Sequence, residues 1–168
     1  LRPSKPRIPI RDITVLAMMS TILIISKEVR NFLPGIEPVS LLIIVYTLVF
    51  GYRTLYIIYT FVLVEGFIFG MGTWWFFYLY VWTILFLIAR IFRKVRDPFF
   101  WAMISGFFGL SFGVFYSFTI IAISGLNAGI VSWINGIYFD IIHGVFNFIL
   151  ALLLFKPLYY IVSKLNNQ

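Results

Sequence analysis

The residues of this chain best suited to chemistry lie on one face of a predicted helix, residues 132–158. At about 100° of rotation per residue, that face holds polar, aromatic and small side chains: Trp133, Gly136, Asp140, His143, Gly144 and Asn147. Asp140 and His143 are three residues apart, so their side chains can touch. Burying an ionisable group at membrane depth costs about 2.5–3.5 kcal/mol, so this face should point into the protein. It either contacts a substrate or forms an internal pair that locks helices together.

Two further carboxylates, Glu65 and Glu37, are candidates for substrate contacts. Glu65 lies in the outer third of a predicted helix, residues 55–71, where it either accepts hydrogen bonds from a ligand or pairs with Lys27 or Arg30. Glu37 belongs to an outer loop, and with the proline that follows it could instead begin the next helix.

An aromatic run from residue 74 to residue 82 opens another predicted helix. Trp75, Tyr78 and Trp82 share one face of it. Aromatic side chains are common at the membrane interface, which explains the tryptophan pair at the start of the helix. Trp82 lies deeper than an interfacial belt requires, so we favour a wall that stacks against a flat ring of a ligand.

The composition requires lipid as the solvent. The chain is 62% hydrophobic and only 11% charged over 168 residues, which leaves too little polar surface for a soluble domain. The net charge of +7 resides in short loops beside apolar runs, a pattern typical of membrane proteins rather than of nucleic-acid binding. There is no cysteine and no Walker, zinc-protease or serine-hydrolase motif. We therefore expect no catalytic site, no metal site and no built-in cofactor.

The apolar runs predict an all-α membrane protein with a single transmembrane domain, residues 1–168. The hydrocarbon core takes roughly 20 helical residues to cross, and six segments qualify, the second of them short: 11–31, 39–52, 55–71, 74–93, 98–124 and 132–158. A re-entrant second segment would reduce the count to five. Asp97-Pro98 predicts a capped start for the fifth helix, and Pro157 predicts where the sixth helix leaves the membrane.

Basic residues divide unequally between the two sides of this map, and only Lys27 and Arg30 fall on the outer side. The side with excess Lys and Arg in short loops faces the cytoplasm, so both termini are predicted to be cytoplasmic. The other 11 basic residues lie on that side: Arg2, Lys5, Arg7, Arg11, Arg53, Arg90, Arg93, Lys94, Arg96, Lys156 and Lys164.

Small residues mark surfaces where helices can approach closely. Gly66 and Gly70 form one G-x-x-x-G pattern, and Gly109 and Gly113 form another; both predict internal packing. A milder small-residue face on the first helix either packs inside or docks another membrane protein: Thr14, Ala17, Met18 and Thr21.

On these residues the chain resembles the substrate-binding (S) component of energy-coupling factor (ECF) vitamin transporters. The resemblance covers nearly the whole chain but is spread thinly. The family carries A-x-x-x-A on its first helix, where this chain has Ala17 and, in place of the second alanine, Thr21. The outer stretch 33–38 and the sequence Gly72-Thr73-Trp74-Trp75 are also similar.

The resemblance implies a vitamin bound at the outer face, beneath the first loop and among the fourth to sixth helices. It implies docking on a membrane-embedded T component with two cytoplasmic ATPases, and toppling that carries the cargo inward across a prokaryotic plasma membrane. The cobalamin-type members are the most similar; a pyrimidine- or pyridoxine-like precursor, or folate, remains open. Two other classes stay open as well: a small membrane enzyme with Asp140 and His143 as an acid–base pair, and a structural subunit.

Overall fold

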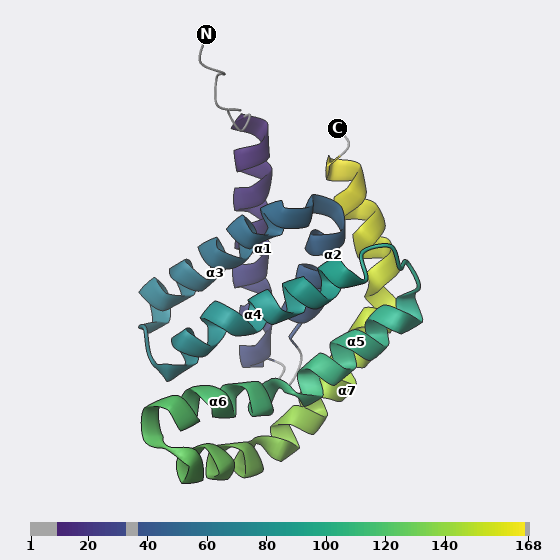
Figure 1. Ribbon diagram of the computed structural model, residues 1–168. Coiled ribbons are helices and arrows are strands. Elements are labelled where there is room, and N and C mark those ends of the chain that lie inside the picture. Colours follow the sequence, from purple (N-terminus) through teal and green to yellow (C-terminus); the bar gives the residue numbers. More distant parts are fainter. Residues whose placement is uncertain (1–9, 33–36, 167–168) are drawn as a thin grey trace.

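The computed structural model describes residues 10–32 and 37–166, and every regular element in them is helical. Residues 33–36 of the outer stretch, and the basic residues Arg2, Lys5 and Arg7, lie outside the described residues. Figure 1 shows the elements in order: α1 Ile10–Phe32, α2 Val39–Phe50, the 3-10 turn η1 Gly51–Arg53, α3 Thr54–Phe69, α4 Thr73–Ile91, α5 Pro98–Leu110, α6 Phe112–Ser124 and α7 Leu126–Asn166. The all-α prediction is confirmed.

Four helical stretches of the described chain are long and apolar enough to cross a membrane: Val39–Phe69, Thr73–Ile91, Pro98–Ser124 and Leu126–Asn166. The predicted count of six spans is therefore not supported. α2, η1 and α3 count together as one stretch, and α1 does not qualify. Only residues 13–26 of α1 are free of charge, because Arg11 and Asp12 precede them and Lys27 and Glu28 follow.

The short helix α2 forms the centre of the structure. Ten of its 12 residues are buried, as expected for a helix that is apolar on all sides. At 1.5 Å per residue it is about 18 Å long, too short to cross a 30 Å hydrocarbon core alone. Gly51, at a φ of 60°, turns the chain into η1 and then α3. α2 packs against α4 and α7, so it supports both helices that carry most of the predicted site.

The predicted fifth helix is two helices. Asp97 starts α5 as expected, and its carboxylate accepts hydrogen bonds from the backbone of Phe99 (3.4 Å) and Phe100 (3.1 Å). The helix then breaks at Ser111, which has φ −90° and ψ −1°. Figure 1 shows α6 leaving α5 at a clear angle. The prediction of one continuous helix was wrong at this point.

The predicted sixth helix is longer at both ends. α7 has 41 residues and begins directly after Gly125, whose φ is 89°. Pro157 lies inside α7 and does not end it. Proline is tolerated within membrane helices because neighbouring groups satisfy the backbone that it frees.

Glycines allow α5 and α7 to approach closely. A Cβ added to Gly109 would lie 2.9 Å from the Cα of Gly144, so the two backbones touch with no room for a side chain. The two glycines of the other predicted pair, Gly66 and Gly70, have different roles. Gly66 faces the indole of Trp75, whereas Gly70, at φ 84°, ends α3 and has nothing within 4 Å of its added Cβ.

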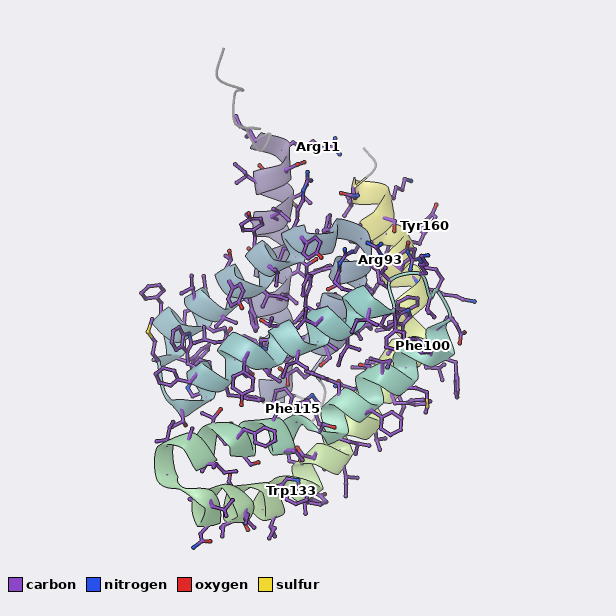
Figure 2. All side chains as sticks on the ribbon, viewed as in Figure 1. Arg11, Arg93, Phe100, Phe115, Trp133 and Tyr160 are labelled. Carbon is purple, nitrogen blue, oxygen red and sulfur yellow. The ribbon has the colours of Figure 1, made fainter. Side chains whose placement is uncertain are left out.

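The start of α1, η1 and the end of α7 meet at one end of the molecule, which we call the basic end. Arg11 donates a hydrogen bond to the carbonyl of Leu165 at 3.3 Å, and Arg53 pairs with Asp12 at 2.7 Å. Arg93 lies toward the same end, and Trp133 lies at the opposite end, on the α6–α7 hairpin (Figure 2).

Candidate functional site

A cavity of about 600 Å³ lies at the end opposite the basic end. It lies among the end of α1, the end of α3, the start of α4, the start of α6 and the first part of α7 (Figure 1). Its size is that of a pocket for a drug-sized ligand. It is lined by Lys27, Glu28, Phe69, Trp74, Phe77, Tyr78, Phe112, Gly113, Tyr116, Ser132, Asn135, Gly136, Phe139 and Asp140.

Aromatic rings make up half of the cavity lining, and they hold one another in fixed orientations. Trp74 meets Tyr78 edge to face at 5.4 Å between ring centroids, and Phe77 meets Phe112 in the same way at 4.8 Å. Edge-to-face pairs of this kind are favourable beyond the area that they bury. These contacts therefore hold the aromatic walls of the cavity in place without a ligand.

The structure places only one of the three predicted wall residues at the cavity. Tyr78 lines it. The indole of Trp75 instead donates a hydrogen bond to the carbonyl of Val62, at 3.0 Å. Trp82 is fully buried in the core, where it packs against Phe112 at a centroid distance of 5.7 Å. Trp74, which was not among the predicted wall residues, lines the cavity instead.

The predicted pairing of Glu65 is present. Its carboxylate forms a buried ion pair with Lys27, and Glu65 is fully buried. Three rings surround the ammonium group at centroid distances of 4.7, 4.9 and 5.5 Å: Phe69, Trp74 and Tyr78. Lys27 lines the cavity and lies between it and Glu65. Glu65 therefore acts on the cavity through Lys27.

Asp140 lines the cavity and is 4% exposed. Its Oδ1 accepts a hydrogen bond from the backbone N–H of Gly113 at 2.9 Å, so a residue of α7 caps the first turn of α6. Its Oδ2 is buried and has no hydrogen-bond partner within the described part of the chain. A Cβ added to Gly113 would collide with the Asp140 carboxylate, which explains the glycine.

His143 and Asn147 of the predicted α7 face are buried, whereas Trp133 is 41% exposed. The Nε2 of His143 lies 3.6 Å from Oε2 of Glu37, and both side chains are buried. Asn147 donates a hydrogen bond to the hydroxyl of Ser40 at 3.3 Å. The helix-capping alternative for Glu37 is not observed, because Pro38 occupies the cap position and no side chain caps α2. These contacts fit the interpretation in which polar residues hold helices together.

The small-residue face of α1 is open. Thr14, Ala17, Met18 and Thr21 are all exposed. The two threonine hydroxyls donate hydrogen bonds to backbone carbonyls of their own helix, Thr14 to Ile10 and Thr21 to Ala17. Of the two alternatives for this face, internal packing is therefore not observed. Ser20, one residue away, is buried and bonds to the Ile57 carbonyl instead.

The cavity residues that sequence reasoning missed follow a helical pattern shifted by one position. Ser132, Asn135 and Phe139 recur at intervals of three and four along α7, as residues on one helical face do. Asn135 lies about 140° around the helix from Asp140, so a face centred on Asp140 would not have included it. The residues from α6 needed the position of the break at Ser111.

The described residues contain no group of three or more metal-ligating side chains. No family model, no curated protein and no solved structure matches this chain.

Proposed function

We propose that this chain is the membrane-embedded, vitamin-binding S component of an ECF-type importer in a prokaryotic plasma membrane. The observation that carries the proposal is the aromatic cavity at the end opposite the basic end. An importer needs its binding site on the side from which the substrate arrives. The chain itself is non-catalytic in this proposal.

The sidedness follows from charge. The described arginines of η1, α4 and the α4–α5 loop lie at the same end of the molecule as the start of α1 and the end of α7. If this basic end faces the cytoplasm, both termini are cytoplasmic and the cavity opens outward. The proposed topology has six passages, with α2 as a short buried second passage and α5 with α6 as a broken fifth.

In this proposal the energy comes from partners, since the sequence has no nucleotide-binding motif. The exposed face of Thr14, Ala17, Met18 and Thr21 is the proposed docking surface for a T component, which would bring two cytoplasmic ATPases. A small-residue face permits close approach of another helix.

The ligand class rests on the sequence resemblance and on the cavity walls. Cobalamin is the first vitamin to test, because the cobalamin-type members are the most similar. A pyrimidine- or pyridoxine-like precursor and folate are the alternatives. Among the predicted contact residues, Tyr78 and Asp140 line the cavity directly, and Glu65 acts through Lys27.

The proposal is tested by filling the cavity. Gly136 lines it and has nothing within 4 Å of an added Cβ, so Gly136→Trp places an indole in open space. The matched control is Ile137→Trp, at an exposed neighbouring position. Calorimetric titration of the purified protein in lipid nanodiscs with a panel of water-soluble vitamins should show one tight binder. Gly136→Trp should lose it and Ile137→Trp should keep it. If none of the vitamins binds, the proposal is wrong.

A further inference from the structure

We propose that the ligand of this cavity is a flat organic cation, a basic nitrogen heterocycle whose positive charge is matched by Asp140. The inference rests on the proposed vitamin-binding function, and it replaces cobalamin as the first candidate with one substrate class. It is carried by the charges that line the cavity and by the rings between them.

The positive charge of the cavity wall is already neutralised. Lys27 is the basic residue among the lining side chains, and it is paired with the buried Glu65. An anionic ligand would have to compete with that carboxylate for the same ammonium group. In a site of low dielectric such competition is unfavourable, since the displaced carboxylate would be left buried without a partner.

Asp140 contributes a negative charge that no side chain of the described chain balances. Its carboxylate makes one hydrogen bond, to the Gly113 backbone, and it forms no ion pair with any described residue. Buried charges are normally paired. A ligand that brings a positive group to Asp140 would complete the pair.

The rings of the cavity favour the same kind of ligand. Aromatic faces attract cations, most strongly where water is excluded. Phe69, Trp74 and Tyr78 already surround the ammonium group of Lys27, which shows that this wall accepts positive charge. Four more rings line the same cavity as Asp140: Phe77, Phe112, Tyr116 and Phe139.

This charge balance separates the ligands that the resemblance left open. A pyrimidine- or pyridoxine-like amine is flat and basic, and fits both the rings and Asp140. Folate carries carboxylates and would place them near Asp140. Cobalamin lacks a flat cationic ring of matching size, so its selection by this cavity would need another explanation.

The test removes the charge of Asp140 and keeps its hydrogen bond. In Asp140→Asn the amide oxygen can still accept from the Gly113 N–H, while the negative charge is lost. Asp97→Asn is the matched control, because Asp97 also accepts backbone N–H groups but lies in the α4–α5 loop, away from the cavity. Thermal unfolding of the three proteins checks that each is folded.

The probes are vitamins sorted by charge, measured by calorimetric titration in nanodiscs. Thiamine and pyridoxamine are cationic, riboflavin and cyanocobalamin carry no net charge, and biotin and folate are anionic. We expect a cationic probe to bind most tightly to the parent protein. Asp140→Asn should weaken it by about 10- to 100-fold, as loss of a charged hydrogen-bond partner does, and Asp97→Asn should not.

The outcomes distinguish this inference from the proposed function. If a neutral or anionic probe binds most tightly, the cation inference is wrong and the vitamin-binding function stands. A cation whose affinity is the same in Asp140→Asn and the parent protein also overturns the role of Asp140. If no probe binds at all, the proposed function fails and the inference fails with it.

Discussion

Asn147 of α7 donates a hydrogen bond to the hydroxyl of Ser40 on α2, with 3.3 Å between Nδ2 and Oγ. Both side chains are buried, and they lie 107 residues apart in the sequence. The bond joins the central helix to the helix that carries Asp140. It therefore connects the packing of the core to the position of the cavity wall.

Asn147→Leu should lower the free energy of unfolding by about 1 kcal/mol, the usual net contribution of one interhelical hydrogen bond. Ligand affinity per folded molecule should stay unchanged, because Asn147 is not at the cavity. Thermal unfolding in detergent and a titration of the folded fraction measure the two quantities. A large loss of affinity without loss of stability would instead place Asn147 in the binding site.

Gly109→Ala should destabilise the protein by about 1–3 kcal/mol, because the added methyl group meets the backbone of Gly144, which cannot move aside. Gly136→Ala is the matched control, since its methyl group enters open space. The two unfolding temperatures give the comparison. Equal temperatures would show that α5 and α7 can separate without cost.

The buried pair of Lys27 and Glu65 should behave as a unit. Lys27→Met or Glu65→Gln alone should cost about 3–5 kcal/mol of stability, because each leaves one buried charge without its partner. The double substitution should recover a large part of that loss. A double-mutant cycle of unfolding free energies measures the coupling; strictly additive effects would contradict it.

Ala17→Trp should abolish co-purification with the proposed T component and ATPases and leave folding and ligand binding intact. Ala17 is exposed, so the indole meets no internal clash, and it would block close approach of a partner helix. Leu153→Trp, on an exposed position of α7, is the control. If both variants retain the partners, the α1 face is not the docking surface.

Local signals in the sequence were enough to predict some features of this fold. Asp97 and the proline after it start α5 because a helix cap depends on neighbouring residues alone. The break at Ser111 could not be predicted in that way. The residue that caps α6 there is Asp140, 27 positions from Gly113.

The candidate site was predicted only in part for the same reason. Tyr78 and Asp140 were found by their residue types and spacing. The choice between Trp74 and Trp75 depended on Gly66 of α3, which leaves space for the indole of Trp75 and so turns Trp74 toward the cavity. Helical periodicity places residues on a face, but the neighbouring helix decides what that face contacts.

The length of α7 links the two ends of the molecule mechanically. At 1.5 Å per residue its 41 residues span about 60 Å, roughly twice the thickness of a hydrocarbon core. Ser132 and Asp140 lie near one end of this continuous rod, and Lys164 lies near the other. A small change of tilt at the cavity would therefore displace the far end of α7 by several ångströms, so this one helix connects the position of the cavity wall to the position of the basic end.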